Sequence, residues 1–183
     1  MKLYKILAQK RSDILKGWLD SILETYPADT RRFLKKRGDR FENPVGYTLK
    51  KGTEDLFAEL IREGDMDRDA VNRHLDGIIR VLAVQDFSPS RAVFFIFNLK
   101  KVIRRALGEE AGDVDLLEDL LKFEHKIDDA ALMAFDIYMK CREKIYEISA
   151  NHAKNQVSSL LRKSGLICEI PEWDPNKPER HLA

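Results

Sequence analysis

Acidic side chains and histidines are the residues of this 183-residue chain that could carry acid–base or metal chemistry. The paired acids Glu109/Glu110 and Asp128/Asp129 are adjacent in sequence, so they point to different sides of a helix and cannot act as acid and base about one bond. The sequence contains none of the usual motifs for phosphate loops, serine hydrolases or zinc proteases. It therefore predicts a protein that is not an enzyme and holds no metal ion.

The four histidines are scattered along the sequence. His74 lies at the edge of an apolar helix face, where it could ligate a haem iron inside a helical pocket, although a packed or partly exposed histidine is the preferred interpretation. His125 precedes Asp128 and Asp129 by three and four residues, which indicates a surface ion pair. We expect no cofactor, and a haem- or small-ligand-binding sensor stays as the alternative.

Composition limits the compartment and the partners. The net charge is +1 although 34% of the residues are charged, so the surface lacks the positive excess of a general nucleic-acid binder. The two cysteines, Cys141 and Cys168, form no metal or disulfide framework, which is typical of a reducing compartment. Residues 1–8 lack the apolar core of a signal peptide, and no segment approaches the roughly 20 apolar residues that span a bilayer. We expect a cytoplasmic protein with no nucleic-acid partner and no membrane insertion.

Charge is distributed unevenly along the chain. Residues 1–50 lean basic and residues 109–129 lean acidic. The two sets could meet within the fold or across a dimer, but solvated helix surfaces are the simpler interpretation.

Helical periodicity dominates the sequence. Apolar residues recur at spacings of three and four almost throughout, and no sustained alternation with turn dipeptides marks a strand, so we predict an all-α chain with one domain. Asn43-Pro44 and Ser88-Pro89 each combine an N-cap residue with a proline suited to the first helical position. Gly38 suits the end of a short helix. Helices are expected over residues 3–25, 28–36, 44–62, about 66–85, 89–107 and 114–163.

The last predicted helix is unusually long because residues 114–163 contain no proline or glycine. At 1.5 Å per residue it would extend about 75 Å, so its distal half must project or pair; a hidden break near residues 149–151 is the alternative. Alternating steps of four and three predict a two-helix seam, with a second apolar stripe at Leu132, Phe135, Met139 and Tyr146. The predicted seam continues from Ile127, Ala131 and Ala134 to Tyr138, Cys141, Ile145, Ile148, His152 and Asn155.

The final segment has a different composition from the helices. Residues 167–183 contain three prolines and show no period, so residues 165–183 are predicted to form an extended tail. Trp173 either anchors this tail on a groove or belongs to a tail that does not dock.

Three segments taken together resemble one family. They are Trp18 with Thr25-Tyr26-Pro27, then Arg40-Phe41-Glu42-Asn43-Pro44-Val45-Gly46, then Ala83-Val84-Gln85-Asp86-Phe87-Ser88-Pro89-Ser90-Arg91-Ala92. Their order and spacing resemble the N-terminal domain of RsbRD-type co-antagonists of the RsbT kinase, the sensory modules of the bacterial stressosome. The resemblance covers about residues 10–155, within one domain predicted over residues 1–155. It implies a globin-like helical bundle that lacks the haem-binding histidine arrangement, dimerises, and passes a signal down its last helix.

The resemblance also assigns roles to single residues. Asn43 and Ser88 are expected to cap helices, Pro44 and Pro89 to start them, and Phe41 and Phe87 to fill the core beside those starts; Gly46 also matches the motif. Three further matches, Gln85, Asp86 and Arg91, are candidates for a pocket that takes a small polar or anionic ligand.

These features together predict a non-enzymatic sensor or interaction domain in bacterial stress or redox signalling. We expect a homodimer that acts through an unidentified regulatory protein. In full co-antagonists the last helix leads into a STAS domain with phosphorylatable threonines, whereas this sequence stops at Ala183 and has no threonine after Thr53. Phosphorylation and stressosome assembly through STAS are therefore not expected. Stand-alone relatives in anaerobic bacteria make an accessory protein of a respiratory or sulfur-metabolism complex a further alternative.

Overall fold

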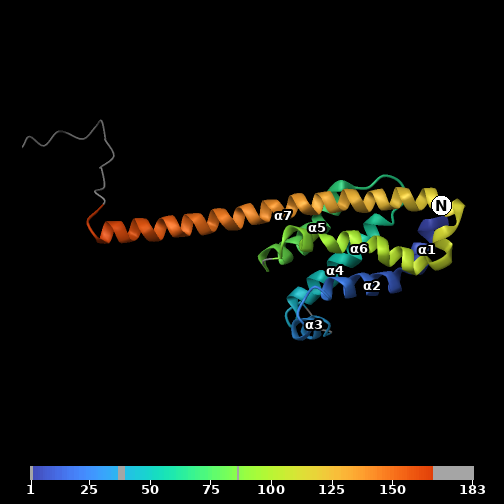
Figure 1. Ribbon diagram of the computed structural model, residues 1–183, viewed down its shortest axis with the longest axis horizontal. Helices are drawn as coiled ribbons and strands as arrows, with labels where there is room; N and C mark the ends of the chain where they lie inside the picture. The colour runs from blue at the N-terminus through green and yellow to red at the C-terminus, as the bar shows by residue number, and fades with distance from the viewer. Residues whose placement is uncertain (1, 37–39, 86, 167–183) are drawn as a thin grey trace, which may run out of the picture. The chain divides into compact units, whose positions relative to one another are not determined.

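The prediction of an all-α chain is confirmed by a computed structural model, which describes residues 2–36, 40–85 and 87–166 (Figure 1). Gly38, Asp86 and residues 167–183 of the predicted tail, among them Trp173, lie outside the described residues. All the regular secondary structure among the described residues is helical. The helices are α1 (Lys2–Gln9), α2 (Arg11–Leu23), α3 (Ala28–Leu34), α4 (Pro44–Leu60), α5 (Arg68–Val84), α6 (Pro89–Leu107), the 3-10 helix η1 (Gly108–Gly112) and α7 (Val114–Lys163).

Side-chain caps start three of these helices. The side-chain oxygens of Asn43, Asp67 and Ser88 accept hydrogen bonds from backbone N–H groups three residues later, at 3.0, 3.0 and 3.4 Å. Each bond satisfies one of the amides that a helix start leaves unpaired. The two predicted cap–proline pairs therefore start α4 and α6 where the sequence placed them.

The first predicted helix is divided, which corrects the expectation of one helix over residues 3–25. Lys10 lies between α1 and α2 with φ −88° and ψ 10°. It falls on the inward stripe between Leu7 and Ile14, both fully buried, where an ammonium group needs partners. Its Nζ donates to the carbonyl of Ala106 at 2.9 Å and to Glu110 at 2.8 Å, which satisfies the ammonium group.

Residues up to Lys144 form one compact unit, and the residues from Ile145 onward form a second. In the first unit, α4 packs against α5 and α2, and α6 packs against α2 and α5. Trp18 on α2 joins three of these helices. It is fully buried, its ring lies 5.9 Å from Phe95 on α6 and 6.5 Å from Phe57 on α4, and its Nε1 donates to the Phe95 carbonyl at 2.8 Å.

The α7 helix is continuous from Val114 to Lys163, so the alternative of a break near residues 149–151 is wrong. Its first part contributes to the core of the first unit through Leu116, Leu120, Phe123, Ile127, Ala130, Ala131, Ala134 and Tyr138. Tyr138, predicted on a dimer seam, is only 2% exposed, so it packs inside the unit and cannot face a second copy. In the second unit, residues 145–163 contain no buried position.

Phe41 corrects a second expectation, since it was predicted to fill the core and is 85% exposed. It lies in the turn before Asn43, outside the helix, and the Arg40 guanidinium lies 5.7 Å from its ring centroid. Phe87, in contrast, packs against the core as expected.

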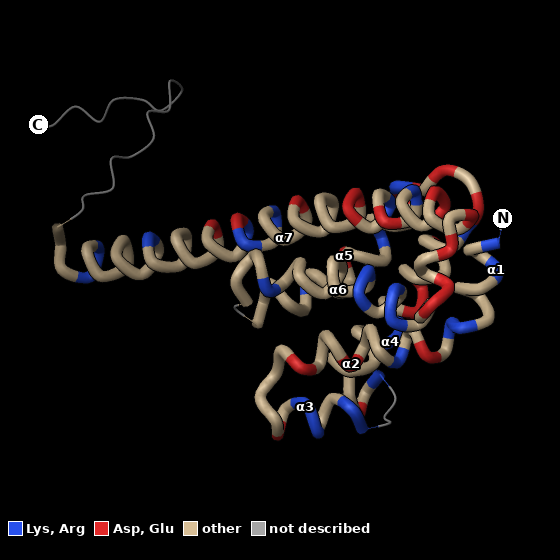
Figure 2. Tube along the Cα trace, turned by 45° about the vertical axis from the view of Figure 1, so that its right-hand side comes forward, with Lys and Arg blue, Asp and Glu red and all other residues tan. Residues whose placement is uncertain are grey.

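Acidic residues around η1 and the first part of α7 lie beside basic residues of α1, of the α1–α2 junction and of α6 (Figure 2). The pairs are Lys2–Asp113, Lys10–Glu110, Lys100–Asp128 and Arg104–Glu124, at 2.6 to 2.8 Å. Such half-exposed pairs stabilise a fold only slightly, by roughly 0–1 kcal/mol each. The basic residues of α3 do not take part in these four pairs. No described helix has the length and apolar content that a membrane span requires.

Candidate functional site

The motif around Asn43 and Gly46 joins two helices. Asn43 is 4% exposed; its Oδ1 accepts from the Gly46 N–H, and its Nδ2 donates to the carbonyls of Leu34 at 3.0 Å and Lys36 at 3.2 Å. One amide therefore caps the end of α3 and the start of α4 at once. A Cβ on Gly46 would lie 2.6 Å from the Leu34 carbonyl oxygen, so the close approach requires glycine. This motif has a structural role.

The other two motif segments meet at the turn between α2 and α3. The Tyr26 hydroxyl donates to Gln85 Oε1 at 2.6 Å, and the Arg91 guanidinium donates to the Thr25 carbonyl at 2.7 Å. The Phe87 ring packs edge-on against Tyr26, with 5.2 Å between ring centroids. The Arg91 guanidinium lies over the Phe87 ring, 5.0 Å from its centroid. Residues about 60 positions apart in the sequence thus form one polar and aromatic cluster.

This cluster surrounds a cavity of about 470 Å³. Gln85 and Arg91 were predicted to line a ligand pocket, and both line this cavity, with exposed side chains that nevertheless have hydrogen-bond partners. The third predicted residue, Asp86, is not described. The remaining lining residues are Thr25, Tyr26, Pro27, Thr30 and Phe87.

The α5–α6 loop beside the cavity is also held by α7. The Tyr138 hydroxyl donates to the Phe87 carbonyl, and Arg142 Nη1 donates to the Ala83 carbonyl at 3.2 Å. Tyr138 and Arg142 are four residues apart and therefore share one face of α7. Phe87 is thus in contact with Tyr26 of the α2–α3 turn through its ring and with Tyr138 of α7 through its carbonyl.

Comparison with known proteins identifies the family. The family model for the RsbT co-antagonist protein rsbRD N-terminal domain matches residues 12–152. The chain belongs to this family. An uncharacterized protein of Archaeoglobus fulgidus is 28% identical to it over 158 residues, which cover 84% of this chain and 90% of the relative. No solved structure matches. The suspected resemblance is confirmed, and the RsbRD N-terminal family is one of regulatory signalling domains.

Within this RsbRD N-terminal domain, Tyr26 is a cavity residue that the predicted site omitted, although it belongs to one of the three motif segments. It is 6% exposed, and burial raises the pKa of its hydroxyl to about 12. The hydroxyl therefore keeps its proton at physiological pH and stays the donor to Gln85. Arg142 was also omitted, and no motif marked it, because its role depends only on packing against the distant α5.

Other candidate residues lie away from this cavity. His74 is half-buried on α5 and lines neither this cavity nor the larger one described below. Cys141 is half-buried, and burial raises the pKa of its thiol, which opposes formation of a reactive thiolate. His152 and Ile148 are exposed in the second unit, and Ile145 is half-buried there. In the described part of the chain, no group of three or more His, Cys, Asp or Glu side chains is placed to hold a metal ion.

Proposed function

We propose that this RsbRD N-terminal domain is a non-enzymatic sensor that regulates a separate protein in stress or redox signalling. The observation that supports the proposal is that α7 is bonded to residues on both sides of position 86. Gln85 and Phe87 line the motif cavity, while Tyr138 of α7 donates to the Phe87 carbonyl and Arg142 of α7 donates to the carbonyl of Ala83 at the end of α5.

A ligand in the cavity would act through the α5–α6 loop. A small polar or anionic molecule competes with the Thr25 carbonyl for the Arg91 guanidinium and with Gln85 Oε1 for the Tyr26 hydroxyl. Each such hydrogen bond contributes about 0.5–1.5 kcal/mol, so exchanging two of them covers the 1–3 kcal/mol range of typical allosteric coupling. Movement of Phe87 then shifts its backbone carbonyl, which accepts the hydrogen bond from the Tyr138 hydroxyl. The signal reaches α7 without catalysis.

Arg91→Ala tests this route by removing the bond to the Thr25 carbonyl. Amide hydrogen exchange is expected to rise about tenfold both at the α5–α6 loop and in α7 around residues 138–142, because one bond of about 1.4 kcal/mol corresponds to that factor. Arg32→Ala, an exposed arginine of α3 that does not line the cavity, is the matched control. Faster exchange confined to the loop, with α7 as in the control, would contradict the proposed coupling.

We also propose that the domain forms a homodimer through the second unit. Its helix carries exposed apolar side chains at alternating steps of four and three, the spacing of a coiled-coil seam. Tyr146, Val157 and Leu160 are 61%, 55% and 63% exposed, and Ala150 and Ala153 lie between them. The seam predicted through Ile148, His152 and Asn155 lies on a different side of the helix and includes two polar positions. The stripe from Tyr146 to Leu160 is the more apolar of the two.

Sedimentation velocity distinguishes the two seams. Leu160→Asp is expected to weaken dimerisation at least tenfold, because it removes a buried leucine contact and places two carboxylates close together. Asn155→Asp adds the same charge on the other side of the helix and is expected to leave the dimer intact. The reverse result would assign the dimer to the seam through His152. A monomeric wild-type protein at micromolar concentration would remove the dimer from the proposal.

A further inference from the structure

A second cavity, of about 810 Å³, lies among α2, the end of α3 and α4. It shares no lining residue with the motif cavity. Its volume lies within the roughly 300–1,000 Å³ of sites that hold small organic molecules. It is therefore large enough for a ligand considerably bigger than a single inorganic ion.

The rim of this cavity is strongly basic. Five lysines line it, against the two carboxylates of Asp20 and Glu54, whereas the whole chain carries a net charge of only +1. The lysines come from all three elements and are Lys16, Lys35, Lys36, Lys50 and Lys51. Positive charge gathered at a concave surface attracts anions more strongly than the same charge on a convex one.

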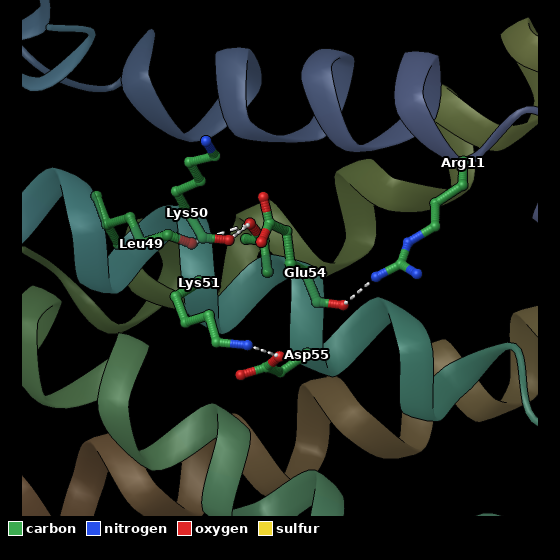
Figure 3. Close-up of polar contacts among 7 residues, drawn as sticks. Arg11, Leu49, Lys50, Lys51, Glu54 and Asp55 are labelled. Atoms are coloured by element: carbon green, nitrogen blue, oxygen red, sulfur yellow. Dashed lines mark hydrogen bonds and ion pairs between the residues drawn. The ribbon is translucent and has the colours of Figure 1, made fainter. Parts of the chain in front are cut away.

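Three of these lysines have ammonium groups available for a ligand. Lys35 pairs with Asp20 at 2.8 Å and Lys51 pairs with Asp55 at 2.5 Å. Lys16, Lys36 and Lys50 have no ion-pair partner among the residues that the structure describes. Figure 3 shows the difference between neighbours: Lys51 turns to Asp55, while Lys50 extends from α4 toward α2.

The interior of the cavity is apolar in part. Leu19 of α2 is half-buried and Tyr47 of α4 is 43% exposed, and both line the cavity; Leu23 and Leu34, which also line it, are only 2% and 7% exposed and lie behind them in the core. A hydrated inorganic anion would leave Leu19 and Tyr47 in contact with water. A ligand that covers them gains the free energy of burying apolar surface in addition to its charge interactions.

We propose that this cavity binds an amphipathic organic anion, with its carboxylate or phosphate at Lys16, Lys36 and Lys50 and its apolar body on Leu19 and Tyr47. The free molecule is the occupant, rather than the headgroup of a lipid within a membrane. The site is independent of the dimer and of the motif cavity, so its test neither relies on nor decides the sensor proposal.

Calorimetric titration of the full chain with octanoate, 1-octanol and inorganic phosphate separates the contribution of the ligand's charge from that of its apolar body. Octanoate is expected to bind saturably, and decanoate about tenfold more tightly, because each added methylene contributes a factor of about three to four. Octanol, which lacks the charge, and phosphate, which lacks the apolar body, are each expected to bind at least tenfold more weakly than octanoate. Equal affinity for octanoate and either of the other two probes would overturn the proposal.

Lysine substitutions locate the site. Lys16→Gln/Lys50→Gln is expected to weaken octanoate binding at least tenfold, and Lys50→Gln alone about threefold. Lys5→Gln/Lys101→Gln removes the same charge from exposed positions outside the cavity and is expected to change nothing. Equal binding by the two double variants would overturn the assignment.

A vesicle-binding measurement distinguishes a free anion from a membrane surface. Binding to phosphatidylglycerol vesicles that requires Lys16 and Lys50, without binding of free octanoate, would overturn the proposal by identifying a membrane surface as the source of the anion.

Discussion

Trp18→Ala is expected to destabilise the domain by about 3–5 kcal/mol, the range for removing a large aromatic side chain from a packed core. Trp18 is fully buried between Phe57 and Phe95, on two different helices, and its indole N–H is bound to the Phe95 carbonyl. The substitution therefore leaves a cavity at the contact of α2, α4 and α6 and removes a buried hydrogen bond. Urea unfolding followed by far-ultraviolet circular dichroism measures the change.

Two companion variants identify the source of this loss. Trp18→Phe keeps most of the ring packing and removes the N–H donor, so it is expected to cost about 1–2 kcal/mol. Phe33→Ala removes an aromatic ring that is 51% exposed on α3, and it is expected to cost about 0.5 kcal/mol or less. If Trp18→Ala cost no more than Phe33→Ala, Trp18 would not be the residue that holds these three helices together.

The sequence was sufficient to predict features that depend on local chemistry. Asn43 and Ser88 were identified as caps because a side-chain oxygen before a proline satisfies amides within the next turn, and both bonds are formed. The continuous α7 followed from the lack of proline and glycine over residues 114–163. These predictions required no knowledge of what packs against the helix.

Features that depend on contacts between distant residues were predicted incorrectly. Lys10 was placed within one long helix, but α1 ends at Gln9 and α2 begins at Arg11, and the partners of its ammonium group, Ala106 and Glu110, lie nearly 100 residues away. Tyr138 has the spacing of a seam residue, but the same spacing serves a core helix, and its partner is the carbonyl of Phe87. Periodicity shows that a helix face is buried and does not show what covers it.

In the candidate site, too, the sequence predicted the motif residues but not their contacts with distant residues. Gln85 and Arg91 were identified because they belong to a family motif, and the structure places both beside one cavity. The motif could not show that their partners are Tyr26 and Thr25, or that Arg142 of α7 donates to the Ala83 carbonyl at the end of α5. The basic cavity among α2, α3 and α4 was not predicted either. Its lysines are dispersed over residues 16–51, and they converge because α2 packs against α4 and because Asn43 joins the end of α3 to the start of α4.

Asn43→Ala is expected to cost about 2–4 kcal/mol, well above the loss of an ordinary helix cap. Removing an N-cap side chain costs about 0.5–2 kcal/mol. Here the same substitution also leaves the carbonyls of Leu34 and Lys36 without their donor, and an unsatisfied buried group costs about 1–3 kcal/mol. Ser88→Ala removes a cap with a single, longer bond of 3.4 Å and is the matched control, with an expected cost of about 0.5–1 kcal/mol.

Asn43→Asp separates the two functions of this amide. The aspartate keeps an acceptor for the Gly46 N–H but replaces the donor with a second oxygen that faces the carbonyls at the end of α3. Because like partial charges then repel, we expect it to be at least as destabilising as Asn43→Ala in urea unfolding at neutral pH, although aspartate is normally a good N-cap. An Asn43→Asp protein as stable as the wild type would show that only the α4 cap matters. The expected result would instead show that the motif joins α3 to α4, and thereby positions the lysines of the basic cavity.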